Sequence, residues 1–167
     1  AAVHGYRVLL VDNDKQGNAS KIMNRHGYDR PGVAEIMTDR AVDMEAVIRR
    51  TDYENLDIIT ANMNLLAANL QVLLDQSRQQ QTRFKKALQQ VSGQYDYCII
   101  DNAPDINIST INALVASDDV LVPVTIDDFA LDGLAELKEQ IDNTREELNR
   151  SLCLRGCFIT QYDRLNE

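Results

Sequence analysis

Two carboxylates stand close together directly after an apolar run near the start of the chain. The segment RVLLVDNDKQGNAS covers residues 7–20 and places Asp12 and Asp14 behind the apolar residues 8–11. A strand that only fills a core gains nothing from two charges at its end, since buried charge is costly. Carboxylates are, however, ligands of Mg²⁺ and can orient water beside a phosphate group. The pair therefore indicates a magnesium or phosphate site.

A third aspartate follows a second apolar run. The segment YDYCIID at residues 95–101 ends in Asp101, in the same position relative to its run as Asp12. In open α/β sheets, ligands bind at the carboxyl ends of the parallel strands. If both runs are parallel strands of one sheet, Asp12, Asp14 and Asp101 are expected at the same ligand-binding edge.

The spacing of apolar residues predicts the elements that position these aspartates. Strands are expected at residues 6–12, 55–62, 95–101, 119–124 and 152–162. Helices are expected at residues 18–25, 32–39, 43–50, 65–74, 83–91 and 109–117, followed by a long helix capped by Asp127 or Asp128 and ending near Arg150. Several strands are continuously apolar, which is typical of parallel strands buried on both faces. The predicted fold class is α/β, a doubly wound, mostly parallel sheet with flanking helices.

Length and composition narrow the class of protein. The 167 residues suggest one domain, and the three cysteines fit reduced thiols in the cytoplasm. No apolar run approaches the roughly 20 residues that a membrane helix needs, so no membrane partner is expected. The net charge of −9 disfavours non-specific nucleic-acid binding by these residues themselves.

Three interpretations of the aspartates compete. A phospho-acceptor receiver domain also ends strands in acidic residues, but Asp12 and Asp101 are too far apart in the sequence, and VLVPVTIDD lacks the expected lysine. A nucleotide hydrolase holds Mg²⁺ with one or two carboxylates and phosphate oxygens. The aspartates can also serve only as turn formers and helix caps. That explanation suits any one of them better than it suits all of them together.

Longer segments carry a family resemblance. YRVLLVDNDKQGNAS and residues 95–137, which begin YDYCIIDNAPDINIST, resemble the ParA/MinD family of deviant-Walker ATPases, which have a P-loop NTPase-like fold. The family's segment between these two regions is similar to NLDIITANMNLLAANLQV, and the strand that follows them is similar to SLCLRGCFITQYD. The similarity is greatest to the ParA/Soj chromosome- and plasmid-partition branch. It covers residues 1–167 as a single, partial ATPase domain.

The resemblance implies roles for particular residues. Asp14 matches the catalytic aspartate that orients the hydrolytic water, and Asp101 matches the Walker B aspartate that holds Mg²⁺ through water. Asp12 matches a partner near the magnesium. The switch segments that sense the nucleotide and line the dimer interface are matched by Gln16, Gly17, Asn18 and Pro104.

The family's activity and partners follow as further expectations. Its members bind ATP and Mg²⁺, hydrolyse ATP as a homodimer, bind DNA non-specifically at the nucleoid and respond to a ParB-type partner. The family's phosphate loop and its DNA-contacting C-terminal part are not found in these 167 residues, which contain no G-x-x-x-x-G-K-[ST] motif. The chain alone is therefore expected to be inactive. The alternative is a naturally short, non-hydrolysing interaction or regulatory module.

Two residues near the matched switches depart from the family pattern. Lys15 stands where the family usually has a proline. It is either a surface lysine or a contact to phosphate. Asp105 is expected to cap the helix that begins near Ser109.

Overall fold

A four-stranded sheet organises the first part of the chain. In the computed structural model, β1 (Val8–Asn13) runs parallel to β3 (Leu56–Ile59) on one side and to β4 (Tyr97–Asn102) on the other. The short β2 (Ile48–Arg50) pairs antiparallel with β3, which gives the strand order β2-β3-β1-β4. The apolar run in β1 is explained by its position, since five of its six residues are buried between neighbours.

The structure describes residues 1–124 and 130–160, with side chains for all of these except residues 130–132. Contacts divide the chain into two compact units, Ala1–Ala113 and Leu114–Glu167, and each is described by itself below. The boundary falls within one helix, α6 (Ile108–Ala116).

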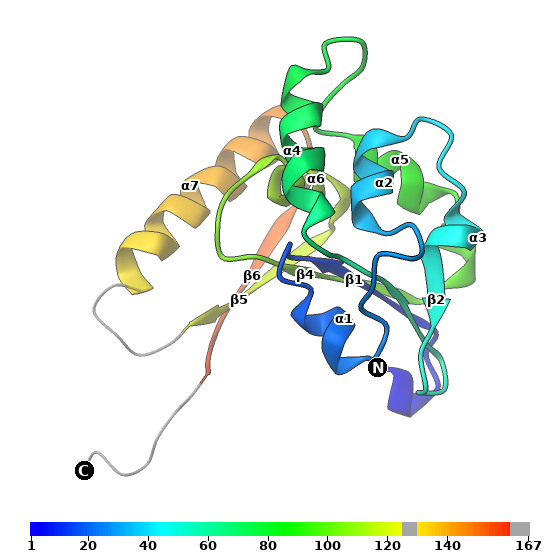
Figure 1. Cartoon of the computed structure of the whole chain (residues 1–167). Helices are drawn as coiled ribbons and strands as arrows, with labels where there is room; N and C mark the ends of the chain where they lie inside the picture. Colours follow the sequence, from blue (N-terminus) through cyan, green and yellow to red (C-terminus); the bar gives the residue numbers. More distant parts are fainter. Residues whose placement is uncertain (125–129, 161–167) are drawn as a thin grey trace. The chain divides into compact units, whose positions relative to one another are not determined.

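The helices of the first unit connect and cover the strands. Figure 1 shows α2, α4 and α5 gathered on one side of the sheet, and α2 packs against both of the others. The apolar residues that these helices bury include Val33, Ile36, Met37, Leu65, Val72 and Phe84. Besides α6, the helical elements of this unit are η1 (Ala2–His4), α1 (Asn18–Ile22), α2 (Val33–Thr38), α3 (Met44–Val47), α4 (Asn64–Leu74), α5 (Arg83–Gln89) and η2 (Ser92–Gln94).

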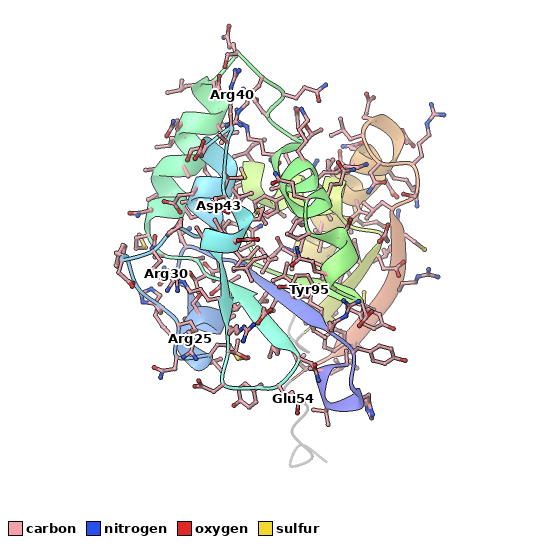
Figure 2. All side chains as sticks on the ribbon, turned by 90° about the vertical axis from the view of Figure 1, so that its right-hand side faces the viewer. Arg25, Arg30, Arg40, Asp43, Glu54 and Tyr95 are labelled. Carbon is pink, nitrogen blue, oxygen red and sulfur yellow. The ribbon has the colours of Figure 1, made fainter. Side chains whose placement is uncertain are left out.

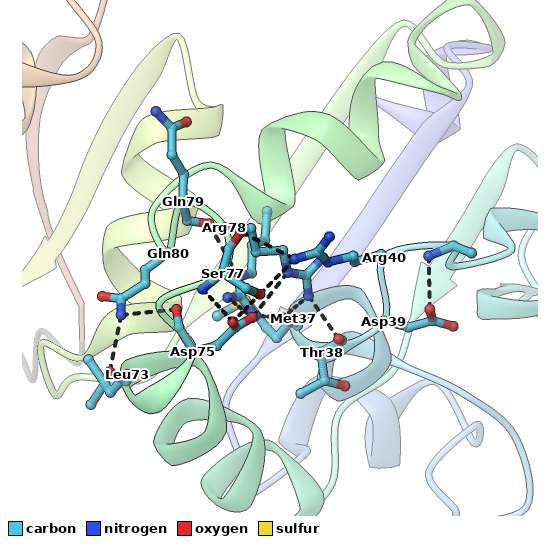
Figure 3. A network of polar contacts seen from close by, with 12 residues as sticks. Met37, Thr38, Asp39, Arg40, Leu73, Asp75, Ser77, Arg78, Gln79 and Gln80 are labelled. Carbon is cyan, nitrogen blue, oxygen red and sulfur yellow. Dashed lines mark hydrogen bonds and ion pairs between the residues drawn. The ribbon is translucent and has the colours of Figure 1, made fainter.

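Two arginines join the carboxyl end of α2 to the segment between α4 and α5, and Figure 3 shows one of them, Arg78, beside Met37 and Thr38. The Arg83 guanidinium donates to the carbonyl oxygen of Met37 at 2.6 Å and to Asp75 Oδ2 at 2.8 Å. Arg78 donates to the carbonyl oxygens of Met37 and Thr38 at 3.1 and 2.8 Å. The last carbonyls of a helix have no partner within the helix, and positive charge there is favourable. These arginines therefore stabilise the end of α2.

The second unit has a smaller sheet of its own. Its strands β5 (Asp119–Val124) and β6 (Cys153–Ile159) are parallel, and α7 (Ala130–Glu147) connects them. Leu114, Ile141 and Leu152 form the buried cluster of this unit. The expected caps Asp127 and Asp128, and the end of the expected strand 152–162, lie outside the described residues.

The predicted fold class is confirmed: the sheet is mostly parallel and is flanked by helices. The helix expected at 43–50 is wrong in its second half, because residues 48–50 leave the helix and extend the sheet as β2. Burial of the expected strands on both faces is also wrong for β4, which is at the sheet edge with Ile99 51% exposed. Among the described residues, no helix is both long and apolar enough to cross a membrane.

Candidate functional site

The register of the sheet brings two of the three aspartates together. Asp12 in β1 is directly opposite Asp101 in β4, and Asn13 is opposite Asn102. Both strands are parallel, so these residues lie at one carboxyl edge of the sheet. Asp14 follows immediately after β1, which ends at Asn13, and belongs to the same edge.

Asp12 is the buried carboxylate of this edge, and its hydrogen bonds hold the neighbouring elements together. Its side chain is fully buried, and its Oδ2 accepts hydrogen bonds from the Ser20 backbone N–H at 2.7 Å and the Ser20 hydroxyl at 2.6 Å. The Ser20 hydroxyl oxygen in turn accepts from the Ala61 N–H at 3.0 Å. Asp12 therefore ties the end of β1 to α1 and to the residues that follow β3.

A tight turn joins Asp14 to the start of α1. Asp14 Oδ1 accepts from the Gln16 N–H at 2.9 Å, and the Asp14 carbonyl oxygen accepts from the Gly17 N–H at 2.8 Å. Gly17 has φ 63°, and a Cβ there would lie 2.6 Å from the Ala61 carbonyl oxygen. Only glycine fits this position without strain. Asn18 is exposed and begins α1.

Asp101 is the exposed carboxylate of the group, and its side chain accepts no hydrogen bond within the described residues. Partial burial raises its pKa, and the nearby negative charges of Asp12 and Asp14 raise it further. The smaller, electrostatic part of this shift reflects repulsion among the three carboxylates, which a bound cation would reduce. The edge is electrostatically prepared for a cation.

The loop after β4 holds the last of the expected site residues. Pro104 is exposed there, and Lys15 Nζ lies 3.7 Å from Asp105 Oδ2. A hydrogen bond from the Asn107 side chain is the main cause that lowers the pKa of Asp105; burial opposes this shift, and the positive charge of Lys15 makes a smaller contribution in the same direction as Asn107. Lys15 thus forms an ion pair with the loop.

The expectation that Asp105 caps the next helix is wrong. Asn107 Oδ1 accepts from the Ser109 N–H at 2.9 Å, the Ser109 hydroxyl at 2.6 Å and the Thr110 N–H at 3.1 Å. Asn107 directly precedes α6 and is better placed for capping, whereas Asp105 accepts from the Asn107 side-chain amide at 3.1 Å.

Sequence reasoning missed Asn13 and Ser20. The Asn13 amide donates to Asn102 Oδ1 at 2.8 Å and to the Ser109 carbonyl oxygen at 3.1 Å, which fastens the two site strands together. The dipeptide Asp-Asn occurs at the end of both strands, at 12–13 and 101–102, and this repetition was the available signal. Asn13 Oδ1 is buried without a hydrogen-bond partner among the described residues.

The donor set at this edge suits magnesium. Within residues 1–124 and 130–160, no three His, Cys, Asp or Glu side chains are placed to hold a metal by themselves. Mg²⁺ does not require such a cage, because it keeps several waters and uses one or two carboxylates together with phosphate oxygens. The unneutralised Asp101 carboxylate and the unpartnered Asn13 Oδ1 are oxygen donors of the kind that Mg²⁺ prefers.

Sequence comparisons identify relatives over nearly the whole chain. A family profile described as "AAA domain" matches residues 1–154. The sporulation initiation inhibitor protein Soj of Bacillus subtilis is 40% identical over 95% of this chain and 62% of its own length. The chromosome partitioning protein ParA of Caulobacter vibrioides is 34% identical over 99% of this chain, which again spans 62% of the relative.

Solved structures are also similar to nearly the whole chain. Cobyrinic acid a,c-diamide synthase from Mycobacterium smegmatis, with bound ATP analog and magnesium, has a TM-score of 0.89 and 31% identity, covering 98% of this chain and 66% of that one. A plasmid partition protein from Borrelia burgdorferi has a TM-score of 0.80 and 25% identity, covering 98% of this chain and 69% of that one.

Proposed function

Because the chain belongs to the ParA/MinD family of ATPases, we propose that it is the core of a ParA-type ATPase for chromosome or plasmid partitioning. The observation that carries this proposal is the pairing of Asp12 with Asp101 across two parallel strands, beside the turn from Asp14 to Gly17. The names of the chromosome partitioning relative ParA and of the plasmid partition protein support partitioning over a non-hydrolysing regulatory module.

Magnesium and ATP are the proposed cofactors of the whole protein. Bound Mg²⁺ neutralises charge on the phosphates of the nucleotide. In this proposal Asp101 would help to hold Mg²⁺, because it is the exposed carboxylate of the pair. Asp12 acts near the metal chiefly by fixing the strand end, since its Oδ2 is already occupied by Ser20.

Asp14 is the proposed catalytic residue. Its Oδ1 accepts from the Gln16 N–H, which orients the carboxylate at the start of the turn. From that position it would orient the water that attacks the terminal phosphate. Gln16, Gly17, Asn18 and Pro104 form the proposed nucleotide-sensing segments, in two loops that leave the ends of β1 and β4.

The proposed partners follow from the family. The whole protein is proposed to dimerise when it binds Mg-ATP, to bind DNA non-specifically at the nucleoid in that form, and to interact with a ParB-type protein. The phosphate cradle and the DNA-binding surface are proposed to come from parts of the whole protein other than these 167 residues, which have no phosphate-loop motif and carry a net charge of −9.

Steady-state ATP turnover of the whole protein tests the proposal. Asp14→Asn removes the carboxylate charge and is expected to lower kcat by about 100-fold or more while nucleotide binding persists. Asp118→Asn makes the same change at an exposed residue in the second unit and is expected to leave kcat unchanged. Absence of magnesium-dependent turnover in the unsubstituted protein, or equal turnover in both variants, would contradict the proposal.

A further inference from the structure

A basic pocket lies at the edge of the first unit, built by residues with no role in the proposed ATPase reaction. It has a volume of about 600 Å³ and is lined by the loop that follows α1 and by β2. Four arginines line it, against a single aspartate. Figure 2 shows Arg25 and Arg30 near each other beside β2. Such an excess of positive charge in a recess favours an anionic ligand.

Arg49 forms the buried part of this pocket. Its side chain is 93% buried, since only 7% of it is exposed. It donates through Nη1 to the Arg25 carbonyl oxygen at 2.8 Å and through Nη2 to the Arg30 carbonyl oxygen at 3.1 Å. Its Nε is buried and has no hydrogen-bond partner among the described residues. A buried N–H of a charged group without an acceptor is costly, and an anion would supply that acceptor.

The charge around Arg49 is incompletely balanced. Burial lowers its pKa, and the positive charges of Arg30 and Arg25 lower it further, whereas the negative charges of Asp29 and, more weakly, Glu35 oppose the shift. Asp29 is a weak counter-charge, because its Oδ1 lies 4.0 Å from Arg49 Nη1 and its side chain is 75% exposed. An anion placed among the arginines would offset the cost of burying the Arg49 charge and would reduce the repulsion between the arginines.

Arg25 and Arg30 differ in how available they are. Arg25 donates to Asp52 Oδ1 at 2.5 Å and through Nε to the Arg50 carbonyl oxygen at 2.8 Å, so it serves mainly to hold the wall of the pocket. The guanidinium of Arg30 is exposed and forms no hydrogen bond or ion pair within residues 1–124 and 130–160. Arg30 is therefore the lining cation whose guanidinium is available to a ligand.

We propose that this pocket binds the phosphate groups of a small phosphorylated ligand. The planar guanidinium matches phosphate oxygens with two parallel N–H donors, which suits phosphate better than a singly charged anion. A pocket of about 600 Å³ with the buried Arg49 side chain in its lining favours a small ligand over the backbone of a nucleic-acid duplex. The pocket also neighbours the nucleotide-sensing turn, because His26, one of its lining residues, provides an atom 2.7 Å from the position of a Cβ on Gly17.

Pyrophosphate is the probe that tests this proposal. The whole protein is titrated with sodium pyrophosphate without magnesium or nucleotide, and the arginine Nε–Hε resonances are followed by NMR. Saturable shifts of Arg49 and Arg30 are expected, with half-saturation below about 1 mM. Arg30→Gln is expected to weaken binding by about tenfold or more, because it removes a charge-assisted contact. Arg150→Gln, the same change at an exposed residue in the second unit, is expected to have no effect.

Three results would overturn the proposal. The Arg49 and Arg30 resonances could stay unchanged throughout the titration. The two variants could bind pyrophosphate equally well. Finally, a DNA duplex could shift these resonances where pyrophosphate does not, which would assign the pocket to a polymer. Since the Arg30 side chain has no hydrogen-bond or ion-pair partner among the described residues, its replacement is expected to leave the thermal midpoint unchanged, so a weakened affinity cannot be attributed to misfolding.

Discussion

Removal of the Ser20 hydroxyl tests how the candidate site is held together. The hydroxyl donates to Asp12 Oδ2 at 2.6 Å and accepts from the Ala61 N–H at 3.0 Å, and both Ser20 and Asp12 are fully buried. Ser20→Ala therefore removes a hydrogen bond to a charged group and leaves a buried backbone N–H without its acceptor. Each loss costs about 1–3 kcal/mol, so the free energy of unfolding is expected to fall by about 3 kcal/mol.

Urea unfolding measures this loss, and the corresponding decrease in thermal midpoint is about 6–12 °C for a chain of this size. Ser92→Ala is the matched control, because its exposed hydroxyl donates only to the Gln89 carbonyl oxygen at 3.1 Å. A change within about 0.5 kcal/mol is expected for the control. If Ser20→Ala were as mild as Ser92→Ala, the inference that Asp12 and Ser20 organise the edge of the sheet would be refuted.

Three further predictions concern the turn, the polar network and the charge at the edge. Gly17→Ala is expected to lower the free energy of unfolding by about 1–3 kcal/mol, because the new methyl group meets a backbone carbonyl at positive φ; an unchanged urea midpoint would contradict this. Hydrogen bonds from Ser77, and then Arg83, hold the pKa of Asp75 below its ordinary value, so Asp75 stabilises the fold above about pH 4 and this contribution is lost as the pH falls further. Asp75→Asn should therefore flatten the acid limb of stability against pH, and a parallel profile would count against the network. Asp101→Asn removes a carboxylate whose pKa is raised by partial burial and then by the charges of its neighbours, so it is expected to raise the thermal midpoint without magnesium and to weaken Mg-ATP binding; a lower midpoint with intact binding would be the opposite result.

The sequence predicted the structure best where an apolar run ended in an aspartate, because both features indicate the end of a parallel strand. Continuous apolar runs predicted parallel strands, and the two runs that end in Asp12 and Asp101 indeed pair in register. The strand at residues 48–50 could not be predicted in the same way. Its residues continue the apolar spacing of α3, and it is the pairing with β3 that makes them extended.

The fine structure of the site was less predictable than its position. The sequence indicated which carboxylates lie at the edge, but the division between a buried Asp12 and an exposed Asp101 depends on partners distant in sequence, such as Ala61. The capping role of Asn107 was similarly hidden, because Asp105 has a comparable propensity for capping and only the exact start of α6 separates them. The basic pocket could not be foreseen either, since the tertiary fold alone brings β2 to the end of α1.

The most direct test of the central claim locates the metal of the nucleotide complex. Mn²⁺ takes the oxygen ligands that Mg²⁺ prefers and broadens nearby NMR resonances. With ATP and Mn²⁺ bound to the whole protein, the backbone amides of Asn13, Asp14 and Asn102 are predicted to broaden selectively, and Asp101→Asn is predicted to weaken the effect. Broadening centred elsewhere in the protein, or unaffected by Asp101→Asn, would contradict the assignment of this carboxylate edge as the magnesium–nucleotide site.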